Sequence, residues 1–181
     1  MSGPEDPAAL QAIADALAVP GPDGVAATAA WIDWDQFVDF VAATVVVGQY
    51  DGYPWHSPGD DAFVWFDPAS GRMTTLPHSL DETFVRDDHD PFSGHGLLLR
   101  TCLESPTCAD DYVTSIWDAQ ATAARFDLAQ YARDVQAQIA SLAVADPARP
   151  YTVDEIVDAQ ADLIDFVVDR SEHLTALIGG Q

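Results

Sequence analysis

Apolar residues recur every three or four positions near the start of the chain. Within residues 7–18 they occur at Leu10, Ile13 and Leu17, a spacing that places all three on one face of a helix. Prolines and glycines then crowd into residues 20–24 and interrupt the spacing. We therefore expect a first helix that is followed by a linker.

Residues 33–48 predict the best-buried helix of the chain. Asp33 stands where an N-cap belongs, and Gly48 stands where a helix would end. The apolar positions between them fall at spacings of three and four and share one face: Trp34, Phe37, Val38, Val41 and Val45.

Two short apolar runs predict one β-hairpin. Residues 62–66 (AFVWF) form the first strand, residues 67–71 (DPASG) have turn chemistry, and residues 72–77 (RMTTLP) return as the second strand. Loops rich in aspartate, glycine and proline flank the hairpin at 49–61 and 81–95. The hairpin can therefore bring carboxylates from two distant loops together.

The rest of the chain is predicted to be helical. Residues 96–105 and about 107–124 form two segments, and a third helix starts at Asp127. The last helix begins with a capping-box sequence in which Thr152 caps the helix and Glu155 reaches back. Its apolar residues mark one face: Ile156, Ala159, Leu163, Phe166, Val167, Leu174 and Leu177.

These patterns predict a mainly α fold with one β-hairpin, an α+β arrangement. The 181 residues can bury a substantial core, and the 48% of apolar residues exclude wholesale disorder. We expect a single domain over residues 1–181. It would consist of a helix and linker in 1–24, a helix, loop and hairpin in 33–95, and a helical part in 96–178.

The charge is strongly negative. Asp and Glu number 30 against 7 basic residues, all of them arginine, which gives a net charge of −23. This field repels phosphate backbones and excludes ordinary nucleic-acid binding, and the lack of lysine excludes mechanisms that need one. A solvated surface, a partner-binding surface and a nucleic-acid mimic all remain open. The last helix carries a regular row of carboxylates: Asp154, Asp158, Asp162, Asp165 and Asp169.

The sequence contains no sign of membrane insertion or export. No apolar run reaches the roughly 18 residues of a membrane span. The first ten residues (MSGPEDPAAL) lack the basic segment and the apolar core of a signal peptide. From these residues we expect either a cytoplasmic protein or part of a longer chain.

Histidines and aspartates suggest metal sites only weakly. The spacing of His56, His78, His89 and His95 matches no zinc motif. Three aspartates near His89 could hold calcium, but their spacing is not that of an EF-hand, and a solvated charge run is the preferred explanation. These aspartates are Asp87, Asp88 and Asp90.

The two cysteines have two interpretations. In an oxidising compartment Cys102 and Cys108 would form a disulfide, whose closed loop would stabilise the fold by about 2 kcal/mol. In a reducing compartment they would be small buried apolar side chains. Their spacing permits both.

Several short motifs follow one another along the chain at characteristic spacings. They are 32–37 (IDWDQF), 47–53 (VGQYDGY), 63–68 (FVWFDP), 71–73 (GRM), 76–84 (LPHSLDETF), 98–108 (LLRTCLESPTC), 151–155 (YTVDE) and 166–171 (FVVDRS). Their order and spacing resemble the C-terminal half of the CotH family, the atypical spore-coat protein kinases, whose pattern runs "D-x-D-x-F", "N-[WY]-D-x-Y", a strand ending "Y-x-[DN]-P", "G-[KR]-F" and "P-W-D-x-D-x-[TS]-F". The resemblance covers about residues 7–178.

The resemblance implies a kinase-like C-lobe that uses ATP and Mg²⁺ to phosphorylate protein Ser/Thr hydroxyls. Asp51 matches the acid that orients the attacking hydroxyl. Asp81 is the second Asp of the last motif, and Asp61 falls near a loop Asn that would help to hold metal in the family, so these two are the expected metal ligands. Two departures stand out: Gln49 replaces the family's Asn, and Ser79 replaces a metal-binding Asp. Because of Ser79 and the missing lysine, the resemblance leaves open whether the chain is active.

The family also implies where the protein works and what it meets. It implies the spore coat, the cell surface or secretion, and a protein substrate or coat protein as partner. Frequent export in the family favours the disulfide between Cys102 and Cys108. The alternative function is a non-catalytic, acidic surface or coat module that keeps the kinase-like fold to bind a partner.

Overall fold

The structure is a computed structural model that describes residues 7–18, 21–49, 51–56, 60–84 and 90–179. It is mainly helical with one two-stranded antiparallel sheet, as the sequence predicts. Its elements, in chain order, are α1 (Pro7–Leu17), α2 (Gly24–Thr28), α3 (Trp34–Val47), β1 (Ala62–Phe66), β2 (Met73–Pro77), the 3₁₀ turn η1 (Leu80–Glu82), α4 (Leu97–Glu104), α5 (Pro106–Ala123), α6 (Leu128–Ala145) and α7 (Val153–Ile178).

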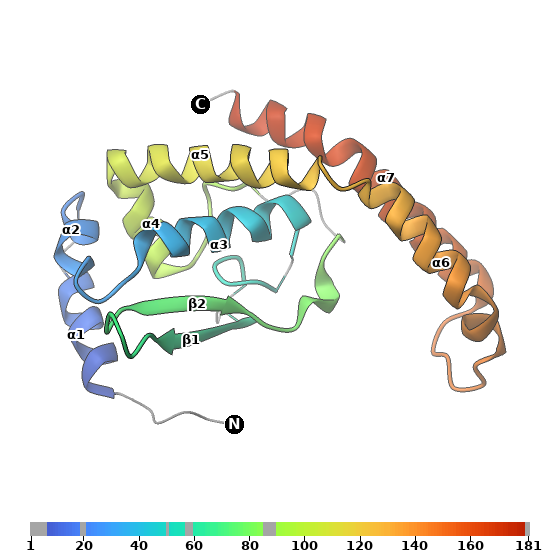
Figure 1. Ribbon diagram of the computed structural model, residues 1–181, viewed down its shortest axis with the longest axis horizontal. Helices are drawn as coiled ribbons and strands as arrows, with labels where there is room; N and C mark the ends of the chain where they lie inside the picture. Colours follow the sequence, from blue (N-terminus) through green and yellow to red (C-terminus); the bar gives the residue numbers. More distant parts are fainter. Residues whose placement is uncertain (1–6, 19–20, 50, 57–59, 85–89, 180–181) are drawn as a thin grey trace.

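The elements form a layered body and a projecting arm (Figure 1). Helix α3 lies between α5 on one side and the β-hairpin on the other, and the end of α7 passes over α5. Helix α6 pairs with the first part of α7 and extends away from these layers. We call α6 together with residues 153–169 of α7 the arm, and the other described elements the body.

Helix α3 is the centre of the core. Nine of its 14 residues are buried, including the five whose spacing predicts a buried face. Gly48 ends the helix as expected, in a left-handed conformation at φ 60°, where a glycine has no Cβ penalty. Asp33 occupies the N-cap position, but its side chain makes no capping bond. Its carboxylate pairs with Arg72 on the hairpin at 3.0 Å.

The hairpin lies against α3 through β2. Strands β1 and β2 pair in antiparallel register from Ala62 opposite Pro77 to Phe66 opposite Met73. The side chain of Gln36 on α3 holds β2, because it accepts from the Thr75 N–H at 2.8 Å and donates to the Thr75 carbonyl at 2.7 Å. This clamp positions the open end of the hairpin beside the end of α3.

Helix α2 begins at Gly24, the last residue of the expected linker, and continues through residues for which the sequence predicts no element. It packs against α1 and α4, and its approach to α4 is close: a Cβ on Gly24 would stand 2.7 Å from the Thr101 methyl carbon. Thr28, fully buried, donates to the Gly24 carbonyl at 2.7 Å and accepts from the Trp34 indole at 3.1 Å. Tertiary contacts thus stabilise five residues that are too few for a helix on their own.

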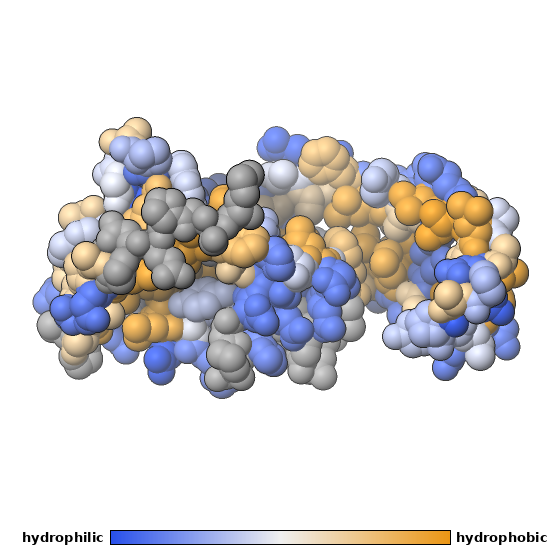
Figure 2. Space-filling model, turned by 90° about the horizontal axis from the view of Figure 1, so that it is seen from below, coloured by the Kyte–Doolittle hydropathy of each residue, from blue (hydrophilic) through white to orange (hydrophobic). Residues whose placement is uncertain are grey.

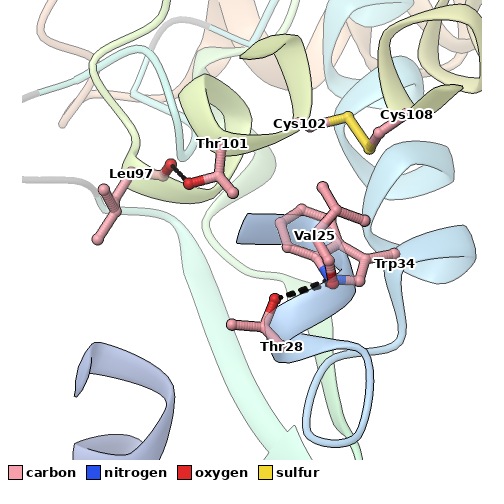
Figure 3. The surroundings of a disulfide bond; sticks show 7 residues. All are labelled: Val25, Thr28, Trp34, Leu97, Thr101, Cys102 and Cys108. Atoms are coloured by element: carbon pink, nitrogen blue, oxygen red, sulfur yellow. Dashed lines mark hydrogen bonds between the residues drawn. A yellow bond between two sulfur atoms is a disulfide. The ribbon is translucent and has the colours of Figure 1, made fainter. Parts of the chain in front are cut away.

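A disulfide joins Cys102 at the end of α4 to Cys108 in the first turn of α5. Both cysteines are buried in the core, close to Trp34 and Val25 (Figure 3). Of the two interpretations that the sequence allows, the structure contains the bridge. The short closed loop fixes the angle at which α5 leaves α4.

The arm has almost no core. Helix α6 has no buried residue over its 18 positions. In α7, only Arg170, Leu174 and Ile178 are buried, and all three lie beyond the arm. The predicted apolar face of α7 is therefore only partly covered. No helix in the described ranges is long and apolar enough to cross a membrane.

Candidate functional site

Two of the three non-glycine residues with positive φ in the described ranges lie at the open end of the β-hairpin. Asp61 precedes β1 with φ 53°, and Ser79 follows β2 with φ 48°. Both are non-glycine residues in the left-handed region, which costs energy and tends to occur at functional sites. The His78 N–H donates to the Asp61 carbonyl at 3.0 Å and joins the two ends.

Gln49 projects from the end of α3 into this strained region. Its backbone N–H donates to the Thr44 carbonyl at 3.1 Å, and its side chain is only 1% exposed. The side-chain Nε2 lies 3.4 Å from Asp61 Oδ2, 3.4 Å from the Ser79 carbonyl and 3.5 Å from the His78 carbonyl. The amide thus donates weakly into a group of three oxygen atoms.

The oxygen of the same amide has no hydrogen-bond partner among the described residues. Gln49 Oε1 is buried, although a buried acceptor of this kind is normally satisfied. The neighbouring Gly52 allows the close approach, because a Cβ there would lie 3.2 Å from Gln49 Cδ.

Asp61 is a buried carboxylate without a cationic partner in the described part of the chain. It is 8% exposed, and its side chain has a long contact to the Gln49 amide but no ion pair there. Burying an ionised carboxylate costs several kcal/mol unless a cation or strong hydrogen bonds compensate it. The site therefore combines a buried carboxylate, without a cationic partner among the described residues, with one amide oxygen that has no hydrogen-bond partner there.

Asp51 lies on the segment next to Asp61. Gly52 forms a β-bridge with Asp60, and the Tyr53 N–H donates to the Asp60 carbonyl at 2.9 Å. The half-buried Asp51 and the buried Asp61 therefore sit on adjoining backbone segments at the same end of the hairpin. Asp51 is the more accessible of the two.

The structure does not bring Asp81 into the same cluster. Asp81 is exposed on η1 and lines a hollow of 770 Å³ against α7. Within the described ranges, no three histidine, cysteine or acidic side chains are grouped to hold a metal. Asp51 and Asp61 thus share one end of the hairpin, while Asp81 faces a different surface.

The other candidate metal ligands gain no support. The calcium hypothesis involves Asp87, Asp88 and His89, which lie outside the described residues. Asp90, at the edge of that segment, uses its Oδ1 to accept from the Phe92 N–H at 2.9 Å, as in an ordinary turn.

Arg170 on α7 donates hydrogen bonds to the last carbonyls of α3, next to the site. The side chain is 5% exposed and donates to the Val46 carbonyl at 3.3 Å and to the Val45 carbonyl. Its guanidinium carbon lies 5.1 Å from the centre of the Phe166 ring. A cation at a helix C-terminus is favourable, and here it holds the residues from which Gln49 projects.

Sequence reasoning identifies Asp51 and Asp61 but treats Gln49 only as a departure from a pattern. The available signal for Gln49 is its place directly after the helix-ending Gly48. For Arg170 the signal is a basic residue inside the apolar face of the last helix, four positions after Phe166. Neither signal shows that the two residues act on the same helix end.

Tyr53 connects the loop that carries Asp51 to helix α4. Its hydroxyl accepts from the Leu98 N–H at 3.0 Å at the start of α4. Burial raises the pKa of this phenol above its usual value, and the Leu98 bond and the charge of Arg100 oppose the rise in part. Tyr53 therefore stays protonated at neutral pH and acts as a structural link.

Comparison with known families gives one match. A family model described as CotH kinase protein matches residues 5–174, which is most of the chain. No curated protein and no solved structure matches the chain. The match includes the end of α3, the hairpin and the Phe166–Arg170 segment described above.

Proposed function

Because the chain belongs to the CotH kinase protein family, we propose that it is a kinase-like lobe that transfers the γ-phosphoryl group of ATP to a protein hydroxyl. The observation that carries this proposal is the buried carboxylate of Asp61 beside Asp51, which has no cationic partner among the described residues. Family membership also supports a connection with the spore coat, so we place the acceptor hydroxyls on coat or surface proteins.

The oxygen atoms at the open end of the hairpin fit Mg²⁺. This ion prefers hard oxygen ligands and commonly takes one or two protein carboxylates, with the remaining positions filled by phosphate oxygens and water. Asp61 supplies a carboxylate. On Gln49, the amide nitrogen Nε2 faces Asp61 Oδ2 at 3.4 Å, and the amide oxygen Oε1 has no hydrogen-bond partner among the described residues. Asp61 would hold the metal. When bound, Mg²⁺ would neutralise the charge that develops on the phosphates.

Asp51 would act on the attacking hydroxyl. Its position on a half-exposed loop leaves the carboxylate accessible to a side chain of another protein. The link between Gly52 and Asp60 holds this loop against the segment that carries Asp61. Asp51 would accept a hydrogen bond from the Ser or Thr hydroxyl and take its proton as the phosphoryl group transfers.

Calorimetric titration with ATP, with and without Mg²⁺, tests this proposal together with a phosphoryl-transfer assay. Asp61→Asn is expected to abolish the Mg²⁺-dependent heat. Asp51→Asn should keep that heat and lower transfer by roughly 10²–10⁴-fold. Asp110→Asn, an exposed carboxylate on α5, is the matched control and should change neither quantity. Heat that survives Asp61→Asn would contradict the assigned metal ligand.

Asp81→Asn belongs in the same series because the sequence also suggests Asp81 as a metal ligand. Its exposed position against α7 predicts a small effect on the Mg²⁺-dependent heat. A loss as large as that of Asp61→Asn would instead show that η1 moves its carboxylate toward Asp61 when the metal binds.

A second candidate function is a non-catalytic coat or surface module that binds a partner. The observation that favours it is the position of the Gln49 amide nitrogen. Nε2 is a hydrogen-bond donor, and it faces the three oxygen atoms that a metal ion would need as ligands. Ser79 adds no negative charge there. If the wild-type chain shows no Mg²⁺-dependent heat at millimolar ATP and no phosphoryl transfer, this candidate replaces the kinase proposal.

A further inference from the structure

The arm carries a long apolar groove that the described chain leaves open. The groove has a volume of 770 Å³ and runs between α6 and α7, with Phe84 at its inner end. Its walls are two rows of side chains: Tyr131, Val135 and Ile139 on α6, and Ile156, Leu163 and Val167 on α7. Figure 2 shows apolar surface gathered on the arm, with hydrophilic surface around it.

The side chains of this groove are poorly covered. Tyr131 is 68% exposed and Ile139 is 45% exposed, and α6 as a whole has no buried residue. In a folded protein, an amphipathic helix gains most of its stability by burying its apolar face. An open groove of this size marks a site where another molecule binds.

Acidic residues line a second hollow that adjoins the groove. The adjoining hollow shares Phe84, Ala159 and Leu163 with it, so the two are continuous. Four carboxylates line that hollow: Asp81, Asp162, Asp165 and Asp169. Arg170 also lines it, but this guanidinium donates to the carbonyls at the end of α3.

The acidic charge beside the groove disfavours a second copy of this chain as the occupant and favours a basic partner. A second copy of this chain would bring a further net charge of −23 to an edge that is already acidic. A partner helix with lysines or arginines beside its apolar face would instead meet opposite charge. The apolar rows fit such a helix, because the span from Leu128 to Ile139 corresponds to about three helical turns.

We propose that the arm groove is a docking site for a basic amphipathic helix of a partner protein. The apolar face of that helix fills the groove between α6 and α7, and its basic residues face Asp162, Asp165 and Asp169. This site is separate from the open end of the hairpin and does not depend on phosphoryl transfer.

Two labelled helical peptides test the proposal by fluorescence anisotropy. They share one leucine face, and their polar positions carry lysine in one peptide and glutamate in the other. The lysine peptide should bind saturably, at least about tenfold more tightly than the glutamate peptide, and should weaken as salt is added. Equal binding of the two peptides, or no binding at millimolar concentration, would overturn the proposal.

Variants separate the groove from the rest of the surface. Ile139→Gln should abolish binding of the lysine peptide, whereas Val157→Gln should not, since Val157 is 56% exposed and lies outside the groove. Asp162→Asn/Asp165→Asn should weaken binding by at least about tenfold, while the matched pair Asp110→Asn/Asp111→Asn should leave it unchanged. Equal effects of the matched variants would overturn the assignment.

Light scattering tests whether a second copy of the chain occupies the groove. The wild-type chain should remain a monomer as its concentration rises, because the acidic edges of two copies repel each other. A concentration-dependent dimer that Ile139→Gln dissociates would show that a second copy fills the groove, and the proposal would then be wrong.

Discussion

Helices α3 and α6 have similar apolar spacing but opposite environments. Nine residues of α3 are buried, because α5 covers one side of the helix and β2 the other. Helix α6 is longer, pairs only with α7 among its main contacts, and has no buried residue. The comparison shows that apolar spacing makes a helix amphipathic, whereas burial requires a second layer on the apolar side.

Helix α7 contains both situations in one element. Over residues 153–169 it borders the open groove and has no buried residue. From Arg170 onward it packs on the body, where Leu174 is fully buried. The body therefore has the core that stabilises the fold, and the arm has surface that is available for binding.

The largest expected effect separates the two regions directly. Phe37→Ala removes a side chain that is 1% exposed in the core, and should cost about 3–5 kcal/mol of the free energy of unfolding. Tyr131→Ala removes an aromatic ring that is 68% exposed on the arm, and should cost less than about 1 kcal/mol. Urea unfolding followed by circular dichroism measures both. Similar losses would contradict the division into body and arm.

The next effect concerns the junction of the two regions. Arg170→Ala removes the guanidinium hydrogen bonds to the Val46 and Val45 carbonyls at the end of α3, of which the Val45 carbonyl keeps the Gly48 N–H, and should cost about 2–3 kcal/mol. Hydrogen exchange at Gly48 and Gln49 should become faster, because these residues follow the helix end that Arg170 holds. The control is Arg133→Ala, an exposed arginine on α6. If exchange at Gln49 is unchanged, Arg170 does not position the site.

The disulfide should matter to the body and not to the arm. Replacing both Cys102 and Cys108 by alanine opens a short loop and should cost about 2 kcal/mol in the chain-entropy model. Thermal unfolding with and without a reducing agent measures this change, and reduction should have no effect on the double variant. Faster hydrogen exchange is expected in α4 and α5, and exchange in α6 should stay the same.

The smallest effect is the pH dependence of the arm. Glu155 has a lowered pKa because its carboxylate accepts from the Thr152 N–H and then from the Thr152 hydroxyl. The folded-state pKa lies below the unfolded value, so this contribution is fully present above the unfolded pKa of about 4.3 and is lost as pH falls through the folded pKa. Glu155→Gln should reduce the acid sensitivity of the first turn of α7.

Hydrogen exchange in the first turn of α7 between about pH 6 and pH 3 tests this expectation. Asp67→Asn is the matched control on the body. Its pKa is lowered chiefly by a hydrogen bond from the Ala69 N–H in the hairpin turn, so it should leave the acid response of α7 unchanged. An identical acid response of wild type and Glu155→Gln would show that the capping carboxylate contributes nothing to the arm.

The elements of the fold follow closely from local sequence. The capping box of Thr152 and Glu155 is present with both of its hydrogen bonds, and Gly48 ends α3 in the left-handed conformation that the sequence suggests. Such signals are local, because caps and turns involve residues only a few positions apart. The sequence does not predict helix α2, whose five residues pack against α1 and against α4, where Thr101 lies 77 positions after Gly24.

The candidate site is predictable only in part. Asp51 and Asp61 follow from the resemblance to a family, and the structure places them on adjoining segments. The position of Gln49 among three oxygens depends on how α3 and the hairpin meet, which no local pattern contains. Asp81 stays a predicted metal ligand, and the structure places it on η1, where it lines a hollow against α7.

The sequence by itself determined the hairpin, the family and every helix except α2, because periodicity, caps and turn residues act over a few positions. Only the tertiary structure decided which apolar faces are buried. The rows on α3 and on the arm are alike in sequence, yet one is covered by α5 and the hairpin while the other lines an open groove. The physical reason is that burial depends on what packs against a face, and that neighbour comes from distant parts of the chain.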